Sequence, residues 1–354
     1  MKTIAIFAAL ALISPAAAQN QPEKSMEERL AAFLKQFPES DGNKDGKLTN
    51  EERIAFNKTR RGAQAERERP QRVAPTHADL TYGDHEKQKF DLWLAESKDG
   101  SPTPLAIYIH GGGFRGGDKR VSGPPPKYLA AGISYASINY RLSDVGPYPI
   151  MMHDAARCLQ TIRHRAEEWN LDPGKIVCYG GSAGAGISLW LAFHEDLADP
   201  DSDDPIARQS TRILAAGTSN GQSTYDMRTF RDWFAAPNLP PHEALPPFYG
   251  IEPKANWDTP EIHALMEDAS AITHLTKDDP PVYMIYGRGD VPVDDKTNAG
   301  VWVHHVRLGL KLKEAMEAIG LECHVRSPDH KEQKFRALED FVAAKLLESE
   351  DEKP

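Results

Sequence analysis

The sequence IVCYGGSAGAGISLWLAF, residues 176–193, joins an apolar run that favours a buried strand to an apolar run that favours a helix. The turn between them fits the pattern G-x-S-x-G, with Gly180, Ser182 and Gly184 at the fixed positions. Such a turn exposes the central side chain, and flanking glycines remove the Cβ atoms that would clash there. The N-terminus of the following helix offers free N–H groups to an oxyanion. The stretch therefore predicts a nucleophilic Ser182; the alternative is a turn of small residues that only packs a strand against a helix.

A second glycine-rich stretch, HGGGF at residues 110–114, follows another strand-like run. Consecutive glycines after a buried strand expose backbone N–H groups that can point into a cavity. No Lys-Ser or Lys-Thr pair follows and no helix is expected to begin there, which disfavours a phosphate-binding loop.

The region around these motifs predicts an α/β fold. From about residue 78, short β-rich runs alternate with helical stretches, which is typical of a largely parallel sheet. Eight strands are expected, at Leu80–Gly83, Phe90–Ala95, Leu105–His110, Ile133–Tyr140, Ile176–Tyr179, Ile213–Gly217, Val282–Tyr286 and Leu321–Arg326.

Over about residues 78–346 the sequence resembles the α/β-hydrolase superfamily, in particular the carboxylesterases and lipases related to hormone-sensitive lipase. The resemblance rests on the two glycine motifs, on NYRL at residues 139–142 and on Asp172-Pro173. It implies an eight-stranded, mostly parallel sheet flanked by helices, and hydrolysis of carboxylic esters through an acyl-enzyme on Ser182. The oxyanion would be held by the N–H groups of Gly111, Gly112 and Ala183.

The resemblance also implies that an acid and then a histidine follow the serine in the chain. Asp290, in the glycine turn after the strand-like run 282–286, is the expected acid. His330, in the loop after the run 321–326, is the expected base, although the usual Gly-His pair is absent there. Asp294 and Asp295 are alternative candidates for the acid. Four other histidines are expected to be structural: His110, His304, His305 and His324.

Residues 41–52, DGNKDGKLTNEE, match an EF-hand calcium loop. Calcium takes six to eight oxygens, and the loop places oxygen-bearing groups at the required positions 1, 3, 5, 7, 9 and 12. Gly46 permits the sharp turn and Leu48 is expected to reach a core; the alternative is a solvated turn between two helices. Only one such loop is found, so we expect the calcium to be structural. The serine mechanism itself needs no metal or other cofactor. The expected ligands are Asp41, Asn43, Asp45, the carbonyl of Lys47, Thr49 and Glu52.

The chain organisation follows from these motifs. Residues 1–18 carry Lys2, a short apolar run and Ala16-Ala17-Ala18, which predicts a cleaved signal peptide and a secreted or periplasmic protein. An EF-hand segment is expected at 24–60, a charged linker at 61–77 and the catalytic domain at 78–354. An aromatic insertion around 220–279 is either a lid that suits a sugar or an aromatic acyl group, or a small satellite core.

Composition limits the partners. The 354 residues carry a formal charge of −10, which disfavours nucleic acid and anionic membrane surfaces. A small-molecule or polysaccharide ester, acylated or feruloylated, is the expected substrate; an amide-type hydrolase (formamidase or peptidase) and an inactive hydrolase-fold binding protein are the alternatives. The three cysteines resemble buried apolar residues, with a Cys158–Cys178 bridge left open.

Overall fold

The computed structural model describes residues 26–56, 73–97, 99–252 and 254–348, and the chain divides into two compact units, Met1–Arg72 and Val73–Pro354. The expected signal peptide lies outside the described residues, as does the greater part of the expected linker. Among the described helices, none combines the length and the apolar character needed to cross a bilayer.

The smaller unit is a helix-loop-helix. Helix α1 (Met26–Gln36) and the 3₁₀ helix η1 (Pro38–Ser40) precede the loop, and residues 50–56 are helical after it. The rings of Phe33, Phe37 and Phe56 pack together, with centroids 4.9 to 6.2 Å apart. Leu48 is only 8% exposed, so this apolar side chain of the loop is buried as its position predicts.

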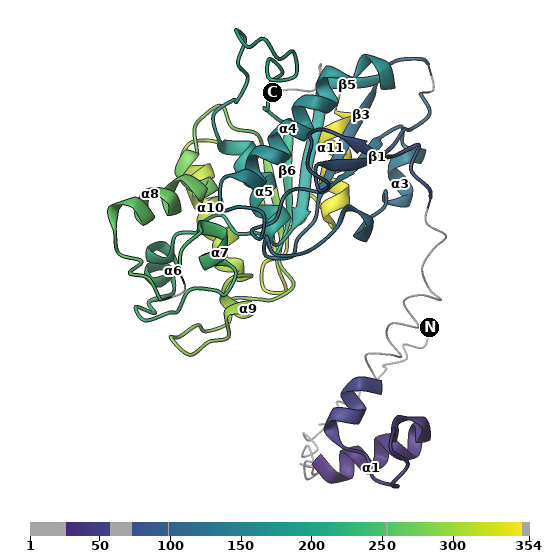
Figure 1. Cartoon of the computed structure of the whole chain (residues 1–354), viewed down its shortest axis with the longest axis vertical. Coiled ribbons are helices and arrows are strands. Elements are labelled where there is room, and N and C mark those ends of the chain that lie inside the picture. The colour runs from purple at the N-terminus through teal and green to yellow at the C-terminus, as the bar shows by residue number, and fades with distance from the viewer. Residues whose placement is uncertain (1–25, 57–72, 98, 253, 349–354) are drawn as a thin grey trace, which may run out of the picture. The chain divides into compact units, whose positions relative to one another are not determined.

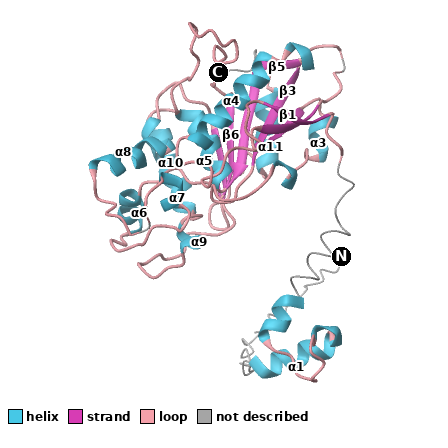
Figure 2. Cartoon of the chain, viewed as in Figure 1, coloured by secondary structure: helices cyan, strands magenta, loops and turns pink. Residues whose placement is uncertain are grey.

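The larger unit is built on one eight-stranded sheet, drawn as the arrows of Figure 2, with the strand order β1-β2-β4-β3-β5-β6-β7-β8. The β1–β2 and β2–β4 pairs are antiparallel and all later pairs are parallel. The predicted fold class is therefore confirmed. The strands are β1 (His77–Thr81), β2 (Lys89–Trp93), β3 (Thr103–Ile109), β4 (Ser134–Ile138), β5 (Leu171–Gly181), β6 (Ala215–Ser219), β7 (Val282–Ile285) and β8 (Cys323–Arg326).

Helices cover both faces of this sheet (Figure 1). Successive residues of a strand point to opposite faces. In β3, Leu105 and Ile107 join the core beneath α4 (Ile150–His164), α5 (Ala183–Phe193) and α10 (Val306–Ala318). Ala106 and Tyr108 instead face α3 (Pro126–Ala130) and α11 (Leu338–Leu347). Both faces are buried, as a parallel sheet requires.

The insertion after β6 contains helices of its own: α6 (Met227–Phe234), α7 (Leu245–Tyr249), α8 (Pro260–Ala269) and η4 (Ala271–His274). Most of its aromatic side chains are buried in the large core, among them Phe230, Phe248 and Tyr249. The insertion is thus part of the fold, and its aromatic residues pack both against one another and against residues outside it, such as Phe114 and Trp302. The remaining short elements are η2 (Lys119–Val121), η3 (Glu167–Trp169) and α9 (Ala299–Trp302).

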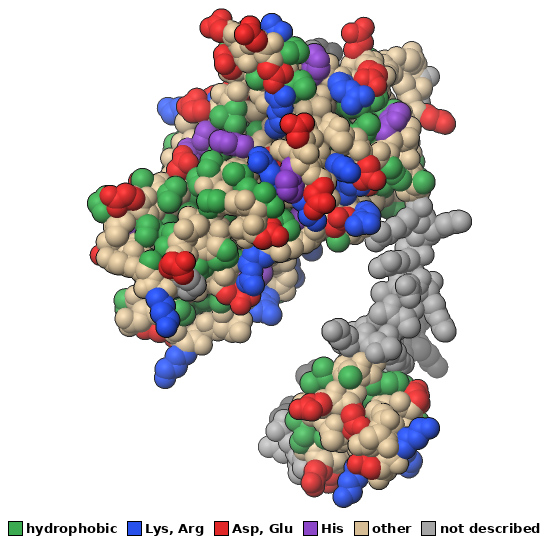
Figure 3. Space-filling view, in the orientation of Figure 1, with side chains coloured by type: hydrophobic (Ala, Val, Ile, Leu, Met, Phe, Trp, Pro, Cys, Tyr) green, Lys and Arg blue, Asp and Glu red, His purple; other side chains and the backbone are tan. Residues whose placement is uncertain are grey.

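The structure also shows the state of the cysteines and the distribution of charged side chains. Cys158, Cys178 and Cys323 are free and buried, so the bridge that the sequence left open is not formed. On the face that Figure 3 shows, acidic and basic side chains of the larger unit are interspersed around hydrophobic ones.

Candidate active site

Ser182 lies at a sharp elbow between β5 and α5. Its backbone has φ +50° and ψ −118°, a strained conformation for a residue with a Cβ, and its N–H donates to the carbonyl of Ser219 at 2.9 Å. The glycine at 184 is dictated by packing, because a Cβ there would lie 2.0 Å from the carbonyl oxygen of Ile109. The elbow therefore packs against the end of β3, and Ser182 follows the carboxyl end of the central strand β5.

The glycine loop after β3 lies directly against this elbow. A Cβ on Gly111 would be 2.6 Å from the carbonyl oxygen of Gly181, and Gly112 has φ +119°, so neither position accepts a larger residue without strain. In the described chain, no hydrogen-bond acceptor is recorded for the N–H groups of Gly111, Gly112 and Ala183. These three amides line the hollows around Ser182 and are available to an oxyanion.

His110 and Tyr140 hold the glycine loop in place. The ring of His110 is buried, stacks on Tyr140 with centroids 4.4 Å apart, and has Nδ1 2.7 Å from the carbonyl of Gly111. The hydroxyl of Tyr140 donates to the carbonyl of His110 at 2.8 Å. Burial lowers the pKa of His110. These contacts agree with the structural role expected for His110, and they give the Tyr of the NYRL motif a function in shaping the loop.

The imidazole beside the Ser182 hydroxyl belongs to His304. Its Nε2 lies 2.8 Å from Ser182 Oγ, within hydrogen-bond reach. Its Nδ1 lies 3.2 Å from the carbonyl of Gly300, and a carbonyl can only accept, so Nδ1 carries the proton and Nε2 presents a lone pair to the serine. Burial lowers the pKa of His304; the bond to Gly300 opposes this shift and the charge of Arg288 adds to it. The ring is therefore neutral at pH 7, as a general base must be.

This geometry contradicts the prediction that His330 is the base. His330 closes a tight turn, with its backbone carbonyl accepting from the N–H of Ser327 at 2.8 Å and its Nδ1 3.0 Å from Ser327 Oγ. Asp329 of the same turn accepts from the N–H of Asp290 at 2.9 Å. The turn thus supports the loop after β7, and the imidazole that lies beside Ser182 is that of His304, a residue expected to be structural.

Asp290 does not contact His304. Its Oδ1 lies 2.9 Å from a guanidinium nitrogen of Arg307 and 3.7 Å from Nε2 of His305. His305 is 1% exposed, its Nε2 lies 2.8 Å from the carbonyl of Val291, and its Nδ1 accepts the N–H of Arg307 at the start of α10. Asp290 is therefore placed to position the segment that carries His304. The rival acids also face elsewhere: Asp294 bonds Thr297, and Asp295 bonds Asn238.

Two hollows meet at Ser182 and His304. The first has a volume of about 520 Å³ and an apolar wall that includes Phe114, Tyr225 and Leu245. The second has a volume of about 540 Å³ and is lined by polar groups, among them Tyr108, Ser219, Asn220 and Arg288. Tyr225 is the insertion's aromatic contribution to the first hollow, so the insertion supplies a pocket wall as well as core.

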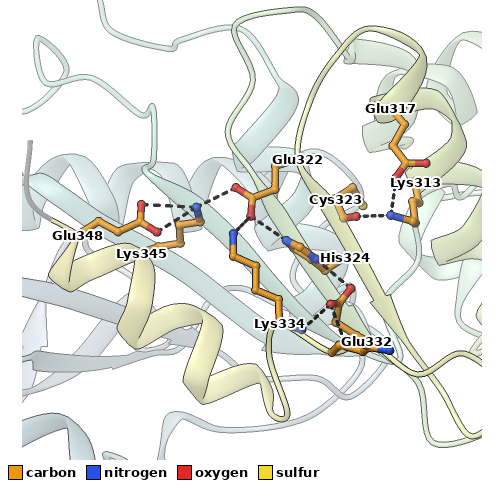
Figure 4. A network of polar contacts seen from close by, with 10 residues as sticks. Lys313, Glu317, Glu322, Cys323, His324, Glu332, Lys334, Lys345 and Glu348 are labelled. Carbon is orange, nitrogen blue, oxygen red and sulfur yellow. Dashed lines mark hydrogen bonds and ion pairs between the residues drawn. The ribbon is translucent and has the colours of Figure 1, made fainter. Parts of the chain in front are cut away.

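His324 takes part in a separate network of charged groups (Figure 4). Its two ring nitrogens lie 2.7 Å from Glu322 Oε1 and 2.9 Å from Glu332 Oε2. Lys334 and Lys345 also bind Glu322, at 2.7 and 2.8 Å. The network ties β8 to α11, which agrees with the structural role expected for His324.

Comparison with known proteins places this site in a family. The family model described as BD-FAE matches residues 90–299, which is more than half of the chain and includes Ser182 and both glycine motifs. The chain belongs to the BD-FAE family. The match ends before residues 304 and 330, so membership alone does not choose between the two histidines.

Curated relatives of this BD-FAE chain carry esterase names. Over 221 residues it is 29% identical to a probable carboxylic ester hydrolase, LipM, of Mycobacterium tuberculosis, with 61% of this chain and 48% of LipM covered. It is 26% identical over 225 residues to the esterase LipQ of the same organism, with 62% and 50% covered. The chain thus spans about half the length of these relatives.

Solved structures support the fold of this BD-FAE chain. A truncated carbohydrate esterase from gut microbiota superposes with a TM-score of 0.59 at 19% identity, covering 79% of this chain and 99% of that one. An acetyl ester-xyloside bifunctional hydrolase from Caldicellulosiruptor lactoaceticus gives 0.55 at 19% identity, covering 73% and 88%.

The candidate calcium loop lies outside the BD-FAE match. The N–H groups of Gly46, Asp45 and Lys47 donate to carboxylate or amide oxygens of the loop, at 2.8 to 2.9 Å. Asp41 Oδ1 is buried and has no hydrogen-bond partner. Hydrogen bonds from the backbone and side chain of Thr49 lower the pKa of Glu52, which keeps this carboxylate ionised. An orphaned buried oxygen among acidic and amide side chains fits a hard cation such as calcium.

Proposed function

We propose that this BD-FAE family member is an exported serine carboxylesterase that uses Ser182 as nucleophile and His304 as base. The observation that carries the proposal is the 2.8 Å contact between Ser182 Oγ and His304 Nε2 at a strained elbow facing three free amides. The esterase names of the curated relatives support the same chemistry.

The mechanism follows from this geometry. His304 Nε2 takes the proton of Ser182 as Oγ attacks the ester carbonyl, and the N–H groups of Gly111, Gly112 and Ala183 stabilise the oxyanion. The protonated ring then gives its proton to the leaving alcohol, and an acyl-enzyme remains. Water activated by His304 releases the acid. Gly300 holds the ring through its carbonyl, and Asp290 acts through the His305 segment as a positioning residue.

The two hollows suggest how an ester is oriented. The apolar wall of Phe114, Tyr225 and Leu245 suits an acyl chain or an aromatic acyl group. The polar hollow with Asn220 and Arg288 suits a hydroxyl-rich alcohol such as a sugar. We therefore infer an acylated or feruloylated saccharide as substrate. The two superposed structures, of a carbohydrate esterase and an acetyl ester-xyloside hydrolase, motivate the same choice.

The activity is tested with purified full-length protein. We expect hydrolysis of 4-nitrophenyl acetate and of methyl ferulate, covalent labelling by a fluorophosphonate, and loss of both in Ser182→Ala. Hydrolysis of the matching 4-nitroanilides at an equal or greater rate would favour an amide-type hydrolase. A folded protein that neither turns over esters nor reacts with the probe would contradict the proposal and favour a binding protein.

We also propose that the loop at residues 41–52 binds calcium as a structural ion, through Asp41, Asn43, Asp45, Lys47, Thr49 and Glu52. The unpartnered Asp41 Oδ1 supports this site. Calcium should raise the melting temperature of the smaller unit's transition in the full chain, whereas Glu52→Gln should remove that response. Unchanged ester hydrolysis on chelation is expected, because no catalytic step uses the ion; an equal calcium response in Glu52→Gln would refute the site.

Export is proposed from the sequence of residues 1–18. When the full sequence is expressed in a host with a secretory pathway, intact-mass spectrometry should show that the exported protein lacks these residues. An unprocessed N-terminus would contradict export.

A further inference from the structure

Three metal-binding side chains meet at the end of α5 that lies opposite Ser182. His194 directly follows α5, Asp268 lies in α8, and His274 ends η4. One ligand atom from each lies within 4.8 Å of the other two. We propose that these three residues form a zinc site.

Both imidazole rings are already oriented by backbone carbonyls. Nδ1 of His194 lies 3.1 Å from the carbonyl of Glu195, and Nε2 of His274 lies 2.7 Å from the carbonyl of Asp268. Because a carbonyl only accepts, each of these nitrogens carries the proton and the other nitrogen of each ring keeps a lone pair. Histidine ligands of metals commonly donate their second N–H to a carbonyl in this way.

The surrounding contacts hold the group together. The His194 ring stacks on Trp190 with centroids 4.0 Å apart, and the two histidine rings have centroids 4.7 Å apart. Asp268 Oδ2 accepts the hydroxyl of Tyr148 at 2.6 Å, while Oδ1 lies 4.0 Å from His274 Nε2, the ring nitrogen that carries the proton. One carboxylate oxygen is therefore anchored by Tyr148, and the other lies near the His274 ring.

The donor set selects the metal. Two imidazoles and one carboxylate suit zinc, whereas calcium and magnesium prefer all-oxygen sites. Zn–N bonds of about 2.0 Å in a tetrahedron put ligand atoms about 3.3 Å apart, so the group must contract by up to about 1.5 Å. The side chains of His274 and Asp268 are 20% and 53% exposed and can rotate to close it. Water would fill the fourth position.

The site would connect the insertion to the nucleophile helix. Helix α5 packs against η4, and zinc would link the residue that follows α5 to two residues of the insertion. The length of α5, 11 residues or about 16 Å, separates this group from Ser182, so zinc would stabilise the fold and take no part in the reaction.

The test is isothermal titration of chelator-treated full-length protein with ZnCl₂, in excess calcium so that the acidic loop at residues 41–52 is filled. We expect one zinc per chain with a Kd of about 1 μM, weaker than structural zinc in zinc-finger peptides because the ligands must move to close the site. A zinc concentration of 100 times Kd should raise Tm by about 5 °C. Hydrogen exchange across residues 260–275 should slow on zinc addition, because the insertion becomes tied to α5.

Matched variants decide the ligands. His194→Gln and His274→Gln should each weaken zinc binding about 100-fold. His164→Gln, an exposed histidine at the end of α4, should leave it unchanged. Asp268→Asn keeps an acceptor for Tyr148, preserves folding and should still weaken zinc binding. Binding weaker than about 100 μM in the parent protein, or equal affinity in all four variants, would overturn the proposal and leave the histidines as packing residues on Trp190.

Discussion

Replacement of His304 by alanine gives the sharpest test of the active site. The only hydrogen-bond partner recorded for Ser182 Oγ within the described chain is His304 Nε2 at 2.8 Å, so the variant leaves the serine proton without an acceptor. A positioned general base contributes about 10²- to 10⁴-fold to the rate. With a carbonyl instead of a carboxylate behind the ring, we expect a loss of about 10³-fold in kcat/KM, or about 4 kcal/mol of barrier.

The matched control is His330→Ala. Among the described residues His330 bonds only within its own turn, through Ser327, so its loss should change kcat/KM by less than about fivefold, or about 1 kcal/mol. Both variants are assayed on 4-nitrophenyl acetate, with circular dichroism to show that each is folded. A His304→Ala protein that keeps more than a tenth of the activity, or a His330→Ala protein that loses it, would refute the assignment.

The decline of kcat/KM at acid pH in the parent enzyme tests the role of the His304 ring independently. His304 acts as a base only when neutral, and burial together with Arg288 lowers its pKa below the ordinary 6.5. Activity is therefore retained as the pH falls to 6.5 and declines only when the pH passes through the lowered value. A kcat/KM midpoint above 6.5 would show that a different group titrates or that the ring is more exposed than the structure has it.

Three further changes probe the supporting structure. Asp290→Asn should lower kcat/KM by less than about tenfold, far below the roughly 10⁴-fold cost in a complete triad, because its carboxylate bonds Arg307 and not His304; a larger loss in steady-state assays would restore Asp290 as the acid. Gly184→Ala should destabilise the domain by about 3 kcal/mol or more in urea unfolding, since its Cβ would lie 2.0 Å from a backbone oxygen; a normal midpoint would mean that the elbow yields. Partial burial raises the pKa of Glu322, but hydrogen bonds from His324, Lys334 and Lys345 outweigh it and lower the pKa from 4.5 to about 2. The stability that ionised Glu322 contributes is therefore present above pH 4.5 and is lost as the pH falls towards 2. Glu322→Gln should therefore flatten the decline of Tm over that range, and an unchanged decline would contradict the network's role.

The sheet could be predicted from sequence because its strands carry a local signal. Each parallel strand is buried on both faces and reads as a short apolar run, and all eight expected runs correspond to strands with shifted ends. The largest shift is at β5, which begins at Leu171, because Asp172 and Pro173 conceal the start of the strand. The elbow could also be predicted from sequence, because packing against the end of β3 requires glycine at 180 and 184 and so leaves a recognisable motif.

The base that we propose, His304, could not be predicted because its position depends on tertiary structure. The sequence predicts a structural role for both His304 and His305, and His305 is indeed the N-cap of α10. His304 therefore lies in the loop between α9 and α10. That loop follows β7, and loops after parallel strands gather at the carboxyl edge of the sheet, where Ser182 lies.

The carbonyl behind His304 has a chemical consequence for the reaction. A carboxylate would orient the ring and also stabilise the imidazolium that forms when the serine loses its proton. The carbonyl of Gly300 orients the ring, but it carries only a partial charge, and Arg288 disfavours a second cation nearby. Proton removal from Ser182 is then harder, while the imidazolium returns its proton more readily to the leaving alcohol. In the proposed mechanism the stabilisation of the transition state then rests more heavily on the N–H groups of Gly111, Gly112 and Ala183.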